Sequence, residues 1–61
     1  MVKGKFYNVA FMAGYDIRYE NNVRCIKLTP KGYRVEREDK TTFIVLKDAI
    51  VDLKSKSFTV N

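Results

Sequence analysis

Few side chains in this 61-residue sequence belong to the types that perform catalysis. There is no histidine, so the commonest general base is missing and neither a Ser-His-Asp nor a Cys-His arrangement can form. The three glycines stand apart from one another, which excludes a glycine-rich phosphate loop. Glu36, Glu38 and Asp39 are close in the sequence, but acidic residues are ordinary in turns. We therefore predict a protein that is not an enzyme and has no catalytic residues.

The single cysteine, Cys25, excludes a disulfide within the chain, and one thiol without any histidine argues against a zinc site of several protein ligands. We predict no metal and no cofactor. The register derived below places Cys25 on the charged face of a sheet, between Arg18 and Glu36, and a neighbouring arginine can make a thiol reactive. We interpret Cys25 instead as a small, half-buried filler.

Basic residues indicate a function more strongly than the catalytic and metal-binding residue types do. Twelve lysines and arginines against seven acidic residues give a net charge of +5, which favours attraction to polyanions such as nucleic acid. Many small soluble domains carry a similar excess without using it, so the charge alone does not establish a function.

The elements that would position these residues follow from the alternation of side chains. Residues 15–20 alternate between apolar and charged, as a half-buried strand does, and residues 23–28 resume the pattern. Asn21-Asn22 between them suits a two-residue hairpin turn. This turn predicts that Ile17 lies opposite Ile26, and it places two further pairs opposite each other: Tyr15 with Leu28, and Asp16 with Lys27.

A second turn is predicted at Thr29–Gly32, because proline and glycine occupy suitable positions. It sets four pairs opposite each other: Leu28 with Tyr33, Lys27 with Arg34, Ile26 with Val35, and Arg24 with Arg37. A third turn at Glu38–Thr41 places Ile44 against Val35 and Leu46 against Tyr33.

Residues 6–13 and 42–47 are apolar on both faces, which is typical of covered strands. Residues 49–53 read as a strand, with a short helix over 48–54 as the alternative. Ser55-Lys56 is then expected to turn the chain into a last strand, Ser57 to Val60.

Together these elements predict a single all-β domain over residues 1–61: a small antiparallel barrel of five to seven short strands, SH3-like. The alternatives are an OB-like barrel, or a β-sheet with the short C-terminal helix. So short a chain has a small core and no disulfide or metal to stabilise it, so we also expect a homodimer.

The predicted registers bring Tyr19, Arg24 and Arg37 side by side. Two like charges in such a row repel unless a carboxylate, the tyrosine ring or an external anion offsets them. An aromatic ring beside arginines is also what single-stranded nucleic acid binds. The alternative is that this row is the solvated, frayed end of the sheet, where long side chains cover the edge of the core. Lys27 and Arg34 form a second basic pair, and four lysines near the chain ends form a third group: Lys3, Lys5, Lys54 and Lys56.

The function predicted from these residues is a small binding module for DNA or RNA that uses a basic and aromatic surface. The alternative is a protein–protein interaction module, acting as an accessory or inhibitor of a larger protein. The sequence has no apolar run long enough to span a membrane, and residues 1–13 do not read as a signal peptide. The lone cysteine favours a cytoplasmic location.

Overall fold

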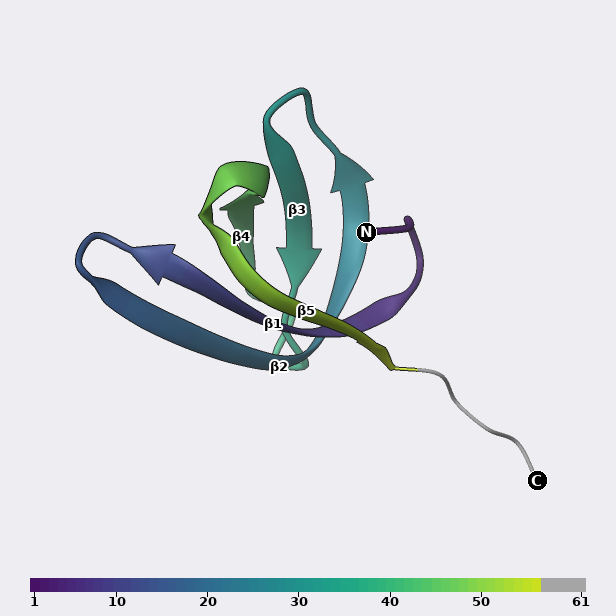
Figure 1. Cartoon of the computed structure of the whole chain (residues 1–61). Helices are drawn as coiled ribbons and strands as arrows, with labels where there is room; N and C mark the ends of the chain where they lie inside the picture. Colours follow the sequence, from purple (N-terminus) through teal and green to yellow (C-terminus); the bar gives the residue numbers. More distant parts are fainter. Residues whose placement is uncertain (57–61) are drawn as a thin grey trace.

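The structure, a computed structural model, describes residues 1–56 and contains one antiparallel sheet of five strands (Figure 1). The elements in chain order are β1 (Phe6–Ala13), β2 (Asp16–Leu28), β3 (Gly32–Glu36), β4 (Thr42–Leu46), the 3₁₀ turn η1 (Lys47–Ala49) and β5 (Ile50–Lys56). The order across the sheet is β4-β3-β2-β1-β5, so β4 and β5 are its two edges. The predicted all-β class is confirmed, and the sheet curls without closing into a barrel.

The first hairpin turns at Gly14-Tyr15, where the sequence analysis had placed the start of a strand. Ala13 pairs with Asp16, so two residues connect β1 to β2. Gly14 has φ of 67° and Tyr15 has no positive φ, as in a type II′ turn with glycine first. The hairpin extends away from the rest of the sheet (Figure 1), and Tyr15 is fully exposed at its tip.

Asn21-Asn22, predicted as a hairpin turn, is instead a β-bulge within the single long strand β2. These two residues lie opposite Asn8 alone, between the pairs Tyr7–Val23 and Val9–Glu20. Asn22 does take positive φ, 58°, and its N–H donates to Asn8 Oδ1 at 2.9 Å. A bulge bends and twists its strand, which is why β2 can serve both halves of the curled sheet.

Three pairs predicted across Asn21-Asn22 are therefore wrong: Ile17 with Ile26, Tyr15 with Leu28, and Asp16 with Lys27. In each pair both residues belong to the one strand β2 or to the turn before it, so they cannot lie opposite each other.

Between β2 and β3 the predicted pairs Leu28–Tyr33 and Lys27–Arg34 are confirmed. The pairs Ile26–Val35 and Arg24–Arg37 are wrong, since Cys25 faces Val35 and Arg24 faces Glu36. The register shifts because Ile26 is an extra residue in β2, a second bulge.

The register between β3 and β4 differs from the prediction by one residue. The connection holds five residues, 37–41, with Lys40 at φ 75°, so Val35 pairs with Phe43 and Tyr33 with Val45. The predicted pairs Ile44–Val35 and Leu46–Tyr33 are therefore wrong, and a shift of one residue exchanges the faces of a strand. Phe43 and Val45 accordingly turn to the core, while Ile44 and Leu46 are exposed.

After β4 the chain makes only the three-residue turn η1 and returns beside β1 as β5. The strand predicted over residues 49–53 is confirmed for residues 50–53, whereas Ala49 belongs to η1; the alternative helix over 48–54 is wrong, because residues 50–54 are in β5. The turn expected at Ser55-Lys56 is also wrong, because both residues belong to β5. The predicted strand Ser57 to Val60 lies outside the described residues.

The core lies on one face of the sheet, which we call the inner face. It is a cluster of small and medium apolar side chains: Val9, Phe11, Val23, Val35 and Val45. Cys25, with none of its surface exposed, lies on the same face. The opposite face, the outer face, is open to solvent. Within residues 1–56 no helix is long and apolar enough to cross a membrane.

Candidate functional site

The outer face is best traced from β1, whose backbone contains no extra residue. Tyr7 and Val9 are buried on the inner face, so Phe6, Asn8 and Ala10 lie on the outer face, where the small Ala10 is itself buried. The extra residues at the neighbouring irregularities belong to β2 and β5. Directly opposed residues share a face, and the register therefore extends the outer face into both neighbouring strands.

Tyr19 and Arg24, two of the predicted site residues, both lie on the outer face. Tyr19 pairs with Ala10 and Arg24 pairs with Phe6. They are five positions apart along β2, but the Asn21-Asn22 bulge corrects the odd spacing and returns Arg24 to the face of Tyr19.

Lys27 and Arg34 join the same face through the second bulge. Arg24 lies opposite Glu36 and Lys27 opposite Arg34, and residues 34 and 36 share a face of β3. Without the extra residue Ile26, simple alternation would turn Lys27 to the core side with Cys25. We name Arg24, Lys27 and Arg34 the basic strip.

The basic strip is open to an external anion. Arg24 and Lys27 are exposed and Arg34 is half-buried. Among residues 1–56 no carboxylate is within 4.0 Å of their side-chain nitrogens; Glu36, on the same face, lies 4.0 Å from Lys40 Nζ. The strip therefore combines three cations that form no ion pair within the described part of the chain, and the carboxylate nearest to it by register is Glu36, opposite Arg24.

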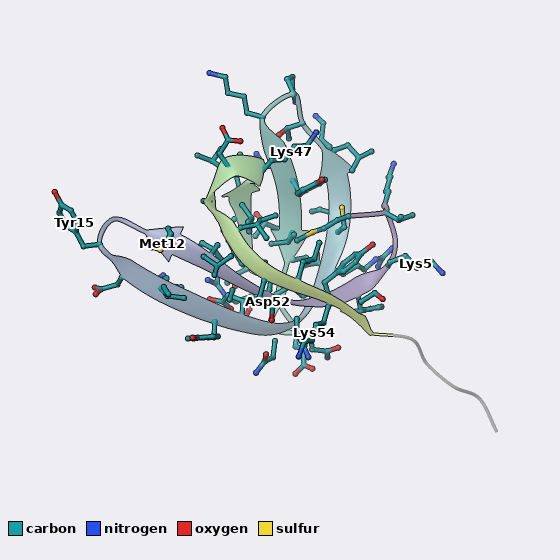
Figure 2. The ribbon with its side chains drawn as sticks, in the orientation of Figure 1. Lys5, Met12, Tyr15, Lys47, Asp52 and Lys54 are labelled. Atoms are coloured by element: carbon teal, nitrogen blue, oxygen red, sulfur yellow. The ribbon has the colours of Figure 1, made fainter. Side chains whose placement is uncertain are left out.

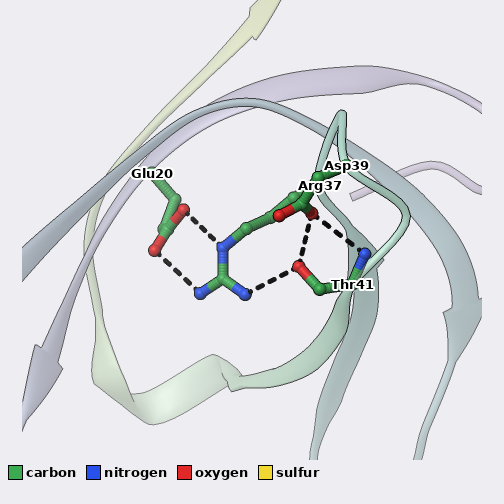
Figure 3. A network of polar contacts seen from close by, with 4 residues as sticks. All are labelled: Glu20, Arg37, Asp39 and Thr41. Carbon is green, nitrogen blue, oxygen red and sulfur yellow. Dashed lines mark hydrogen bonds and ion pairs between the residues drawn. The ribbon is translucent and has the colours of Figure 1, made fainter.

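Arg37, the third member of the predicted row, is turned toward Glu20 and the core and reaches the outer face only at the rim of a hollow beside Arg24. Its Nε and Nη2 donate to the two carboxylate oxygens of Glu20, each at 3.0 Å (Figure 3). Its guanidinium carbon lies 4.1 Å from the centroid of the Phe43 ring, which stacks on Phe11 in the core. The hydrogen bond with Glu20 raises the pKa of Arg37. The predicted row of Tyr19, Arg24 and Arg37 is thus wrong, and Arg37 covers an end of the core.

The carboxylates considered for catalysis have structural partners. Asp39 accepts hydrogen bonds from the Thr41 hydroxyl at 2.6 Å and the Thr41 N–H at 3.0 Å, and these lower its pKa (Figure 3). Thr41 Oγ1 also accepts from Arg37 Nη1 at 3.2 Å. Glu38 accepts a hydrogen bond from the side-chain amide of Asn22. This loop is therefore a hydrogen-bonded connection beside the bend of β2.

Cys25 does not lie on the charged face that the predicted register assigned to it. Its backbone N–H donates to Lys5 O at 3.0 Å on one side, and Val35 faces it on the other. Because its side chain is completely buried, the thiol is a core group and not a surface nucleophile. In residues 1–56 no three side chains of the metal-binding types come together.

Two shallow hollows border the outer face. The first, of about 200 Å³, lies beside Tyr19 and is lined by Asn8, Val9, Ala10, Tyr19, Asn21, Asp52 and Lys54. The second, of about 220 Å³, lies beside Arg24 and is lined by Phe6, Asn22, Arg24, Glu36, Arg37, Glu38 and Lys40. Figure 2 shows Asp52 and Lys54 on β5, where it crosses β1.

The terminal lysines fall into different surroundings. β5 pairs with β1, so the two terminal strands do meet, with Lys54 opposite Asn8 on the outer face. Lys5 directly precedes Phe6 at this same end of β1, and its carbonyl oxygen accepts a hydrogen bond from the Cys25 N–H at 3.0 Å. Phe6, Asn8 and Asp52 are members of the outer face that were not predicted from the sequence. The Gly-Tyr pair at 14–15 was the signal for Phe6 and Asn8, since it sets the register of β1 on β2. Asp52 is placed only by the pairing of β5 with β1.

Comparisons with protein-family models, with curated proteins and with solved structures found no match to this chain.

Proposed function

We propose that this protein is a non-enzymatic binding module whose outer face binds nucleic acid. The observation that carries the proposal is the position of the basic strip. The Ile26 bulge brings Arg24, Lys27 and Arg34 onto one solvent-facing surface, and Tyr19 lies on the same surface. Four of the five residues predicted for the site thus share a face, although Lys27–Arg34 is the one predicted pair among them that the register confirms.

The spacing of the basic strip suits a phosphate backbone. Arg24 and Lys27 are three residues apart, about 10 Å along a strand, and Arg34 is on the neighbouring strand about 5 Å away. Cations gathered so closely repel one another, and a bound polyanion relieves that repulsion. Arginine also forms two parallel hydrogen bonds to a phosphate, which makes two of the three groups well suited to this ligand.

The test is the salt dependence of binding to a fluorescein-labelled oligonucleotide, followed by fluorescence anisotropy. We expect Arg24→Ala, Lys27→Ala and Arg34→Ala each to weaken binding by about 1 kcal/mol. Each should also make the slope of log K against log salt shallower by about one unit for every phosphate that the variant no longer binds.

Arg18→Ala is the matched control for this test. Arg18 is exposed on β2 but pairs with Phe11, so it lies on the inner face beyond the core. The Arg18→Ala variant loses the same charge as the variants of the basic strip, and its effect on binding should be much smaller. Equal effects of Arg18→Ala and Arg24→Ala would show that net charge, and not the strip, determines binding. Failure of the wild-type protein to bind at low salt would refute the proposal altogether.

The fold proposed with this function is the SH3-like one. Its support is the strand order, in which β5 returns beside β1 after a 3₁₀ turn, and the strong curl of β2. Closure would require β4 and β5 to approach across the open side. Backbone NOEs between these edges in solution would support a closed barrel, and their absence would leave an open, curled sheet. A cytoplasmic location is proposed with it, because the lone thiol has no second cysteine in the chain with which to form a disulfide.

A second candidate function is docking on a larger protein as an accessory or inhibitor. The observation that favours it is exposed apolar surface on the β1–β2 hairpin, where Met12 and Ile17 share the outer face and Tyr15 occupies the tip (Figure 2). Three results together would support this function over the first. A protein partner would stay bound after nuclease treatment, would be lost with Ile17→Lys and would be kept with Arg24→Ala.

A further inference from the structure

We propose that the hollow beside Tyr19 is a subsite for one unpaired nucleobase, so that the ligand of the outer face is single-stranded. This inference rests on the proposed function and deepens it. It concerns a different part of the outer face from the basic strip, so the two can be tested separately.

The hollow exists because a small residue lies between two larger ones. Tyr19 on β2, Ala10 on β1 and Asp52 on β5 form one row across the sheet. Two strand spacings, about 9–10 Å, separate the outer members of the row, and Ala10 between them extends no further than Cβ. The floor of the hollow is therefore the sheet itself, and its walls are the Tyr19 ring and the side chains of β5.

The size of the hollow suits one ring and not a larger molecule. Its volume of about 200 Å³ is below the roughly 300–1,000 Å³ of pockets that take drug-sized ligands. The Tyr19 side chain is 74% exposed, so its ring offers a face on which a planar base can stack.

Polar groups around the hollow match the edge of a base. Asn8 Oδ1 accepts the Asn22 N–H, and within residues 1–56 its amide nitrogen has no hydrogen-bond partner and can donate to a ligand. Asp52 supplies an acceptor and Lys54, on the next row beside Asn8, supplies a cation for a phosphate. Donors and an acceptor around one aromatic face are the means by which proteins bind unpaired bases.

The ligand must be single-stranded because a paired base is not available to Tyr19. In a duplex both faces of a base are stacked on its neighbours and its pairing edge is occupied. Tyr19 and Arg24 are five residues apart on one strand, at most about 17 Å. A short unpaired strand can therefore place its backbone on the basic strip and one base beside Tyr19.

The experiment compares binding of a single-stranded oligonucleotide with binding of the duplex of the same sequence. We expect the wild-type protein to prefer the single strand. Tyr19→Ser should weaken single-strand binding about 10-fold and leave duplex binding and the salt slope unchanged. Ala10→Leu, which fills the hollow without changing charge, should have the same effect.

Tyr19→Phe and Ile17→Ser are the matched controls. Tyr19→Phe keeps the ring and should stay within about twofold of wild type, and Ile17→Ser alters the same face two residues away without touching the hollow. Should Ala10→Leu fail to fold, a mononucleotide titration of the wild-type protein replaces it. Amide NMR shifts centred on Ala10 and Asp52 would support the subsite, and shifts confined to the basic strip would overturn it.

The two proposals fail in different ways. If Arg24→Ala weakens binding while Tyr19→Ser does not, or if duplex binds as well as single strand, the base subsite is wrong and the proposed function stands. If neither form of nucleic acid binds at low salt, both are wrong.

Discussion

Arg24 and Arg37 have the same side chain and opposite surroundings. Arg37 is held by both oxygens of Glu20 and by the Thr41 hydroxyl and lies over the Phe43 ring, so three of its five N–H donors are already used. Arg24 projects from the outer face with no carboxylate within ion-pair distance in the described residues. A charged group without an internal partner is available to a ligand, whereas a bidentate pair must first be broken.

At the level of single residues, the pKa of the Asp39 carboxyl group can also be tested. Its hydrogen bonds from Thr41 stabilise the carboxylate, so the pKa lies below the ordinary value of about 3.9. We expect a carboxyl-detected NMR titration to give a midpoint below that value. In Thr41→Val the midpoint should rise only part of the way, because the backbone N–H of residue 41 still donates to the carboxylate.

The sign of the stability effect follows from the lowered pKa. The contribution of Asp39 is fully present above the ordinary pKa and is lost as the pH falls through the lower folded-state value. Acid unfolding of the wild type should therefore include a component below about pH 4 that is smaller in Thr41→Val. Thr41→Ser retains the hydroxyl and should titrate like wild type; if it behaves like the valine variant, the hydroxyl is not the cause.

At the level of elements, β2 decides the geometry of the sheet. It is one strand of 13 residues with an extra residue at Asn21-Asn22 and another at Ile26. The first bulge bends the strand between the projecting hairpin and the core, and the second turns Lys27 outward. Both irregularities are thus linked to the function we propose, because they determine which side chains share the outer face.

The Asn22 bulge can be tested through its backbone conformation. Asn22 has φ of 58°, which asparagine tolerates and a β-branched residue does not. We expect Asn22→Val to lower the free energy of unfolding by about 1–3 kcal/mol, measured by urea denaturation. Asn22→Gly also removes the side-chain hydrogen bond to Glu38 but accepts positive φ. It should unfold close to wild type, and equal destabilisation by both variants would contradict the backbone explanation.

Gly32, the first residue of β3, should tolerate no side chain. A Cβ built there would overlap the Val45 carbonyl oxygen and come 2.9 Å from Leu46 Cα, both backbone atoms of β4. Because backbone cannot move aside as a flexible side chain can, Gly32→Ala should destabilise the protein by about 1–3 kcal/mol or more. Amide hydrogen exchange should show the reduced protection concentrated in β3 and β4. Unchanged protection of these strands would contradict the predicted clash.

At the level of the whole molecule, stability rests on a small core of four valines and Phe11, with the buried Cys25 on the same face. The buried thiol makes a test of cooperative unfolding. We expect an aromatic disulfide reagent to label Cys25 only through unfolding, so that the labelling rate rises with urea as the unfolded fraction does. An exposed thiol, Thr42→Cys in a Cys25→Ala background, should react at once. Immediate labelling of wild type would show that the centre of the sheet opens locally.

The homodimer stays a prediction. Ile44 and Leu46 are exposed on β4, which is an edge strand, and such an edge can pair with a second copy. Sedimentation at micromolar concentration distinguishes a dimer from a monomer of 7.1 kDa.

The features of the fold that could be predicted from the sequence are those with a short-range cause. Alternating and β-branched residues specify strands, and the proline-glycine turn at Thr29–Gly32 sets the nearest pairs, Leu28–Tyr33 and Lys27–Arg34. The bounds of β1 also follow from its two-sided apolar pattern. Each of these depends on residues a few positions apart, where local conformational preference is sufficient.

Tertiary structure alone decided which of two turn signals ends the first hairpin. Asn21-Asn22 and Gly14-Tyr15 are both acceptable turns locally, but only the second lets β1 pair along β2 and bury Val9 and Val23 on one face. The two bulges could not be predicted from the sequence either. One extra residue reverses the faces of all later residues in the strand, and whether that arrangement is stable depends on burial against other strands. That long-range packing forms the outer face and places Tyr19, Arg24, Lys27 and Arg34 together on it.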